Sequence, residues 1–243
     1  NIGDFGNGTE VIEGTKPKKE ALFIDLIKEI DVINGIDRFR ISSIEPNLCT
    51  EEIIDFVAQS NSFVPHFHIP LQSGSPEILR LMQRRYKREL YSDRVSYIKE
   101  KMPHACIGVD VIVGFPDETD DDFIESFEFI KSLDISYLHV FTYSERANTL
   151  AATMENSVDM HTRRKRNEML RNLSSAKKSN FYSQFESSTA NVLFEHSKAD
   201  GRMTGFTDNY IKVDFPLQAN MINQIAKVEL GKFDSGKMMM EGE

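Results

Sequence analysis

Cysteine is scarce in this chain of 243 residues, which contains only Cys49 and Cys106. The two lie far apart and form no C-x-x-C or similar spacing, so the sequence has no cysteine framework for metal ligands or multiple disulfides. One structural disulfide between them is possible. Two buried, reduced thiols are the more common arrangement in a cytoplasmic protein. From the sequence alone we therefore predict no metal ligand.

Other absences exclude further classes of protein. Nothing approaches the roughly 18 consecutive apolar residues of a membrane span, and no signal peptide is visible, so we predict a cytoplasmic protein without membrane contact. The net charge of −9 excludes broad, nonspecific binding to nucleic acid but leaves room for a local basic patch. P-loop and HExxH motifs are missing, and no Ser-His-Asp order is readable, so catalytic residues stay unassigned.

What is present is a regular alternation of strand and helix patterns. Strands are predicted at residues 36–42, 63–71, 105–113 and 136–142, and helices at 16–33, 51–57, 76–82, 91–102, 119–133 and 161–185. Thr50 is the predicted N-cap of the second helix, and Pro76 occupies the favourable first position of the third. Alternation with short connections predicts a parallel α/β architecture with right-handed crossovers, as in the later βα units of a barrel or partial barrel.

The segment VDVIVGFPDET, residues 109–119, predicts a buried strand, a Gly-Pro turn and an acidic helix start. Ligands bind in α/β folds beyond the carboxyl ends of parallel strands. Candidate ligand-facing segments are therefore 42–45, 68–75, 112–116 and 141–144. The alternative is that these turns are only well capped, and that His68 is a hydrogen-bonded core histidine.

After the fourth strand the sequence changes character twice. The helix over 161–185 is basic at its start, and we predict that Arg163, Arg164 and Arg166 contact an RNA backbone; a plain charged surface helix is the alternative. From residue 188 the pattern becomes alternating, with Asp-Gly and Gly-Lys turns, which predicts a small all-β barrel. The expected domains are residues 1–187 and 188–243.

Several motifs in fixed order resemble the radical S-adenosylmethionine (SAM) methylthiotransferases. They are NIGDFG, RISSIEP, HIPLQSGSPEILRLMQRRY, VDVIVGFPDETDDDF and HVFTYSERANTLAA. GFTDNYIKVDF and the closing β-module are similar to that family's TRAM domain. The wording around TDNYIKV is most like the branch that converts N6-threonylcarbamoyladenosine in tRNA to its 2-methylthio form. The alternatives are the sister branch that modifies a ribosomal-protein aspartate, and a non-catalytic RNA-binding module.

The resemblance implies a partial TIM barrel that uses SAM and [4Fe–4S] clusters and acts on a tRNA anticodon stem-loop. It also implies roles for individual residues. Ile112 and Gly114 match an adenine-contacting position, with Val140 and Phe141 as its other wall. Ser43, Glu45 and Gln72 match the methionine and ribose side, and Arg84 matches the Arg of the family's M-x-R-x-Y wording.

The chain departs from the family in its cysteines, because CxxxCxxC and the auxiliary-cluster cysteines are missing. Both are expected upstream of Asn1. Three thiolates are the minimum for a site-differentiated cluster, so we expect the chain alone to be inactive and to hold no cofactor firmly. An unpaired barrel edge along residues 38–43 is expected to favour self-association.

Overall fold

The computed structural model describes residues 2–6, 22–197 and 200–242, so the predicted start of the first helix at residue 16 lies outside the described residues. The α-helices are α1 (Phe23–Asp31), α2 (Glu51–Gln59), α3 (Pro76–Leu81), α4 (Arg88–Lys101), α5 (Asp120–Ser132) and α6 (Met160–Ser183). Short 3-10 turns cover Ile2–Asp4, Leu150–Thr153 and Ala219–Met221. Two predicted helix-start signals are confirmed. The Thr50 side chain caps α2 by accepting from the Ile53 amide, and Pro76 occupies the first turn of α3.

Three strands form a parallel sheet in the order β1 (His66–His68), β2 (Cys106–Val113) and β3 (Tyr137–Thr142). The predicted strand over 63–71 is therefore shorter than expected. Pro65 and Pro70 bound it because proline has no amide N–H to give to a ladder. The prediction of a regular strand over 36–42 is wrong. This segment contacts β1 and the residues just before it only through two isolated bridges, Phe39–Phe63 and Ser43–His68.

The two faces of this sheet differ in chemistry. Phe67, Ile107, Val109 and Val111 are buried in one apolar core with residues of α1, α2, α4, α5 and α6. The other face carries polar and aromatic side chains, namely His66, His68, Asp110, Tyr137 and His139, which line cavities. Parallel sheets are usually apolar on both faces. A polar face on this one therefore marks where a ligand or substrate can be held.

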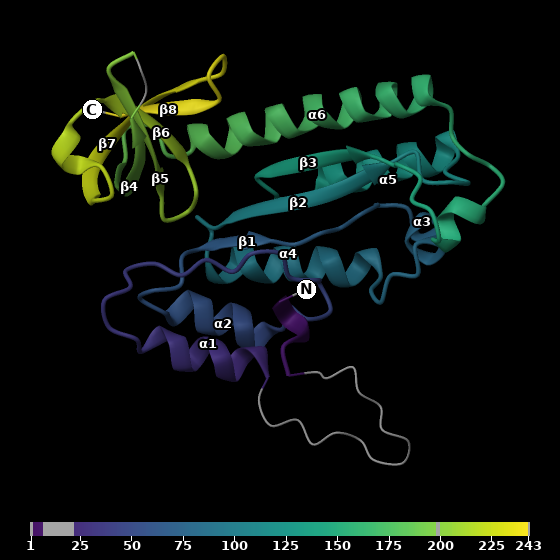
Figure 1. Cartoon of the computed structure of the whole chain (residues 1–243), viewed down its shortest axis with the longest axis horizontal. Helices are drawn as coiled ribbons and strands as arrows, with labels where there is room; N and C mark the ends of the chain where they lie inside the picture. Colours follow the sequence, from purple (N-terminus) through teal and green to yellow (C-terminus); the bar gives the residue numbers. More distant parts are fainter. Residues whose placement is uncertain (1, 7–21, 198–199, 243) are drawn as a thin grey trace.

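Residues after α6 form a closed barrel of β4 (Thr189–Ser197), β5 (Arg202–Thr207), β6 (Lys212–Pro216), β7 (Ile225–Asp234) and β8 (Met239–Gly242), in the order β4-β5-β6-β8-β7. Figure 1 shows this barrel beside one end of the parallel sheet, at the C-terminal end of α6. The predicted β-module is thus present as a closed barrel. Its TRAM identity and a domain boundary at residue 188 stay predictions.

Direct contacts join the barrel to the α/β part. The Arg38 guanidinium donates to the carbonyls of Asn191 and Phe206, and the Asn209 amide donates to the His104 carbonyl. The Tyr182 hydroxyl on α6 accepts from the Lys212 amide. No described helix is both long and apolar enough to cross a membrane.

Candidate functional site

The first cavity, with a volume of about 590 Å³, opens at the carboxyl ends of β2 and β3. Four of the predicted site residues line it: Gln72, Arg84, Ile112 and Phe141. Ile112 and Phe141 are paired in register on neighbouring strands, so their side chains lie next to each other on the polar face. Phe141 is 51% exposed and lines the cavity, so its ring is available to contact a bound molecule.

Backbone contacts fix Gln72 at the floor of this cavity. Its amide donates to the Asp110 carbonyl, and its own carbonyl accepts from the Ile112 amide. Its φ is +71°, in the left-handed region that is unfavourable for a residue with a side chain. Backbone in such conformations is common where a side chain is aimed at a ligand.

Arg84 lies near Glu45, with 3.9 Å between Nη1 of the guanidinium and Oε1 of the carboxylate, an ion pair at the limit of contact. Arg84 follows α3, and the buried Nε of its guanidinium has no hydrogen-bond partner among the described residues. The Arg84 side chain is 28% exposed and lines the cavity, so its guanidinium can meet an oxygen of a bound molecule. Tyr86 steadies the segment by donating to the carbonyls of Pro70 and Leu71.

A second cavity of about 630 Å³ lies between the polar face of the sheet and the barrel. It is lined by residues of both parts, including Ser43, His66 and His68 from the α/β part and Phe206 and Tyr210 from the barrel. Ser43 therefore lies in a different cavity from Gln72 and Arg84. Its predicted place in one binding site with them does not follow from the structure.

The surroundings of Val140 and Gly114 differ from the predicted contact with adenine. Val140 packs against the apolar core, because side chains alternate along a strand and its neighbour Phe141 faces the cavity. Gly114 is buried with φ +72°, and a Cβ there would clash with the Arg163 side chain. The absent side chain at Gly114 thus makes room for an arginine from α6, which corrects the prediction that it admits adenine.

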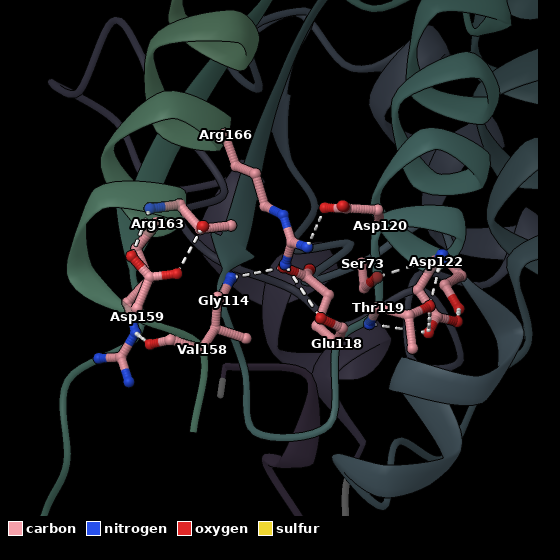
Figure 2. Close-up of polar contacts among 12 residues, drawn as sticks. Ser73, Gly114, Glu118, Thr119, Asp120, Asp122, Val158, Asp159, Arg163 and Arg166 are labelled. Atoms are coloured by element: carbon pink, nitrogen blue, oxygen red, sulfur yellow. Dashed lines mark hydrogen bonds and ion pairs between the residues drawn. The ribbon is translucent and has the colours of Figure 1, made fainter. Parts of the chain in front are cut away.

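Arg163 and Arg166 are buried, which corrects the prediction that they contact RNA from the surface of α6. Arg163 donates to the carbonyls of Tyr143 and Val158 and pairs with Glu145. Figure 2 shows Arg166 reaching the loop after β2, where it pairs with the buried Glu118. Both side chains therefore join α6 to the loops that follow β2 and β3. Arg164 is exposed and lines the same shallow pocket as Arg171, and its contact with RNA stays a prediction.

The contacts of Arg166 also affect the pKa of Glu118 and the position of the turn between β2 and α5. The Glu118 carboxylate accepts from the Gly114 amide at 2.7 Å and from Arg166. Burial raises the pKa of Glu118 above its ordinary value, and the Gly114 and Arg166 contacts offset only part of that rise. Because Arg166 also pairs with Asp120 at the start of α5, one side chain fixes the turn that carries Ile112 into the helix.

The sequence reasoning missed a polar cluster on the inner face. His68 Nε2 lies 2.9 Å from Asp110 Oδ1, and His139 Nδ1 lies 3.3 Å from the same oxygen. Beside them, burial lowers the pKa of His66 to about 3, so this imidazole is neutral, and its Nε2 lies 3.1 Å from the Tyr137 hydroxyl. The alternating pattern of Tyr137 and His139 was the available signal, since both must share a strand face.

The cysteines do not fit an iron–sulfur cluster. Cys49 is buried in the α/β core and Cys106 in the core that includes the barrel, and both are free thiols, as predicted. Burial raises the pKa of each thiol to about 12, whereas cluster ligands are thiolates. By contrast, the apolar walls, the Gln72 amide and the Arg84 guanidinium of the first cavity suit a nucleoside with a charged tail.

A model of the radical SAM superfamily matches residues 13–130. The threonylcarbamoyladenosine tRNA methylthiotransferase MtaB of Bacillus subtilis is 39% identical over 88% of this chain and 49% of its own length. MtaB of Aquifex aeolicus is 37% identical over 77% of this chain and 45% of its own. The tRNA-2-methylthio-N6-dimethylallyladenosine synthase of Desulfitobacterium hafniense is 35% identical over 85% and 46%.

The chain spans about half the length of these curated relatives. Among solved structures, the radical SAM enzyme coproporphyrinogen III oxidase (HemN) from Escherichia coli aligns over 86% of this chain and 50% of its own, with 13% identity and a TM-score of 0.46. The superfamily match and the relatives in sequence show that the chain belongs to the radical SAM methylthiotransferases.

Proposed function

We propose that this chain forms the SAM-holding part of a tRNA methylthiotransferase whose substrate is N6-threonylcarbamoyladenosine. The first cavity carries the proposal, because it combines the apolar walls Ile112 and Phe141 with polar groups at its floor and rim. Relatives named for the threonylcarbamoyl substrate reach 39% and 37% identity, and those named for the dimethylallyl substrate reach 35%, which favours the first branch.

In this proposal each residue binds or orients the cofactor. Ile112 and Phe141 enclose the adenine ring, and the Gln72 side chain hydrogen-bonds the ribose. Arg84, held near Glu45, meets the methionine carboxylate through the part of its guanidinium that lines the cavity. SAM, when bound, supplies the methyl group and the radical chemistry of the reaction.

Binding of S-adenosylhomocysteine, measured by calorimetry, tests this assignment. We expect weak binding by the chain, and at least a roughly tenfold loss in Phe141→Ala or Arg84→Ala, because each removes a contact worth 1.4 kcal/mol or more. The matched control is Leu150→Ala, an exposed apolar residue that does not line the cavity. Equal affinity of all four proteins would contradict the proposal.

We further propose that the chain alone holds no [4Fe–4S] cluster and is inactive. Its only two cysteines are buried in different cores with protonated thiols. Iron analysis and EPR after anaerobic reconstitution test this: we expect no stoichiometric cluster. One EPR-active [4Fe–4S] centre per chain would overturn it.

The proposed macromolecular partner is the anticodon stem-loop of a tRNA, and the proposed location is the cytoplasm. Because Arg163 and Arg166 are buried, the proposed phosphate contacts are made by Arg164 and Arg171, which are exposed and line one shallow pocket on α6. Reversing both charges should weaken binding of a stem-loop RNA and reduce the slope of its salt dependence by about 2. Lys28→Glu on α1 is the control, and an unchanged slope in the double variant would rule out these contacts.

The two alternative functions, ribosomal-protein modification and RNA binding without catalysis, predict different modification patterns in cells whose gene for this protein is deleted. Loss of 2-methylthio-N6-threonylcarbamoyladenosine from tRNA, measured by nucleoside mass spectrometry, is the expected outcome. Normal tRNA with an unmodified ribosomal-protein aspartate would instead assign the sister branch. A non-catalytic RNA-binding module predicts that both modifications persist.

We also propose that residues 39–43, at the outer side of the sheet, allow weak self-association. Within the described residues this segment is bridged to the chain around β1 on one side, although Arg38 ties its start to the barrel. Native mass spectrometry over a range of concentrations is the test. A monomer at all concentrations would reject it.

A further inference from the structure

Three side chains on the polar face of the sheet converge on one point. His68 lies at the end of β1, and Asp110 and His139 are direct register partners on β2 and β3. One potential ligand atom from each lies within 4.8 Å of the other two. Neighbouring parallel strands thus bring together two imidazoles and one carboxylate that are far apart in the sequence.

The two distances from Asp110 to the imidazoles match the spacing of ligands around a metal ion. Ligands about 2.0–2.1 Å from a metal lie roughly 2.9–3.4 Å apart along an octahedral or tetrahedral edge. The distances from Asp110 Oδ1 to His68 Nε2 and His139 Nδ1 are 2.9 and 3.3 Å.

The surroundings leave room for an ion and for further ligands. Asp110 lines the first cavity, whereas His68 and His139 line the second, so the cluster lies where the two cavities meet. The side chains of His68 and Asp110 are 14% and 22% exposed, and that of His139 is 54% exposed. The cluster is therefore shielded by the sheet on one side and open to cavity space on the other.

From this geometry we propose that His68, Asp110 and His139 form a binding site for a divalent transition-metal ion. Two imidazoles and one carboxylate suit Zn²⁺ or Fe²⁺, since Ca²⁺ and Mg²⁺ prefer oxygen ligands and no thiolate is present to select a softer ion. Three protein ligands leave at least one position open toward the cavities, as in metal sites that hold water or substrate.

The cluster is prepared to bind a cation. The backbone of Asp110 is fixed because its carbonyl accepts from the Leu71 and Gln72 amides. Its carboxylate lies between the two imidazoles, because Oδ1 is 2.9 Å from His68 Nε2 and 3.3 Å from His139 Nδ1. This site is separate from the cysteine-held clusters of the family and does not depend on the proposed substrate.

Titration of the chelator-stripped, tag-free chain with Zn²⁺ against a chromophoric competitor tests the proposal. We expect one saturable equivalent, and visible absorption bands when Co²⁺ replaces Zn²⁺. His139→Ala and Asp110→Asn should weaken Zn²⁺ binding more than about 100-fold, because losing even a residue that only supports a ligand costs roughly 10–100-fold. His139 is exposed, so its removal should leave the fold intact, as circular dichroism would verify.

The matched control is His161→Ala, which removes an exposed histidine of α6 that is absent from the cluster. Zn²⁺ should raise the unfolding temperature of the wild type and of His161→Ala, but not of the two ligand variants. No saturable binding in the wild type, or equal binding in His139→Ala and Asp110→Asn, would overturn the assignment.

Discussion

Arg166 joins three parts of the chain through one buried side chain. It donates to the Glu118 carbonyl and carboxylate and pairs with Asp120, while Glu118 in turn accepts from Gly114. A buried pair contributes little compared with a well-packed apolar substitute, but losing one partner leaves a buried charge without compensation. The role of this arginine is to position the turn after β2.

Arg166→Ala should therefore lower the free energy of unfolding by about 3–5 kcal/mol. Without the guanidinium, the already raised pKa of Glu118 rises further. A carboxyl group whose folded-state pKa is raised costs nothing below its unfolded-state pKa, and its penalty grows as the pH rises from that value to the folded-state pKa, above which it is constant. The loss should thus be larger at pH 8 than at pH 5 in urea unfolding. Arg166→Met with Glu118→Gln should recover part of it, and a pH-independent loss would argue against the buried charge.

Gly114 and Gly35 allow the contact with Arg163 to be separated from backbone strain. Both have positive φ, of +72° and +88°, but a Cβ meets Arg163 at Gly114 and nothing within 4 Å at Gly35. Gly35→Ala should cost about 1–2 kcal/mol from conformation alone. Gly114→Ala should cost roughly 1–3 kcal/mol more from overpacking. Equal losses in thermal unfolding would show that Arg163 moves aside freely.

Helix starts control how the elements meet at the cavities. Thr119 caps α5 by accepting from the Asp122 amide, while the Asp122 carboxylate accepts from the Thr119 amide, a reciprocal capping box. The Ser75 hydroxyl, which caps α3, donates to the same Asp122. The starts of α3 and α5 are therefore coupled through one carboxylate near the strand ends.

Thr119→Ala should lower the free energy of unfolding by about 1 kcal/mol, because an amide of the first turn loses its acceptor. Thr119→Ser keeps the hydroxyl and should be nearly neutral. Chemical denaturation of the three proteins measures the difference. If the serine variant lost as much as the alanine variant, the methyl group of Thr119 and not its hydroxyl would be responsible.

Elements with strong local signals were predictable from sequence. Thr50, Pro76 and the buried run before Gly114 each carry their own chemistry, so their positions follow from short-range rules. The segment before Ser43 was not predictable as irregular, because alternation in sequence does not say whether a neighbour supplies enough hydrogen bonds. The same limit applies to the site: Ile112 and Phe141 follow from strand ends, but the convergence of His68, Asp110 and His139 depends on register between strands.

The burial of Arg163 and Arg166 was beyond sequence reasoning for a related reason. Spacing shows which residues share a face of α6, but not which loops fold over that face. The neighbouring carboxylates come from loops that are distant in sequence. Arginines at a helix start can therefore be exposed to solvent or buried in ion pairs with nearby loops, and only the tertiary structure distinguishes the two.

On the scale of the whole molecule, the barrel is fastened to the α/β part by a few hydrogen bonds and a shared core. Cys106, at the start of β2, packs in one apolar cluster with Phe181 and Tyr182 of α6 and with Val213 and Met240 of the barrel. The Tyr182 hydroxyl accepts from the Lys212 amide at 3.0 Å. The barrel should consequently unfold together with α6.

Tyr182→Phe should lower the free energy of unfolding by about 1–3 kcal/mol, because the Lys212 amide is left without its acceptor. Tyr143→Phe is the matched control. The Tyr143 hydroxyl is buried and has no hydrogen-bond partner among the described residues, so its removal should be neutral or slightly stabilising. Equal destabilisation of the two variants in urea would contradict this account.

The two buried cysteines provide a chemical reporter on how these parts open. With the pKa of each thiol near 12, both are protonated and shielded in the folded protein, so an alkylating reagent reaches them only when the surrounding core opens. Cys49 belongs to the α/β core and Cys106 to the core shared with the barrel. The alkylation rates of the two thiols, followed by peptide mass spectrometry, therefore measure the opening of the two cores separately. Equal rates would mean that they open as one cooperative unit.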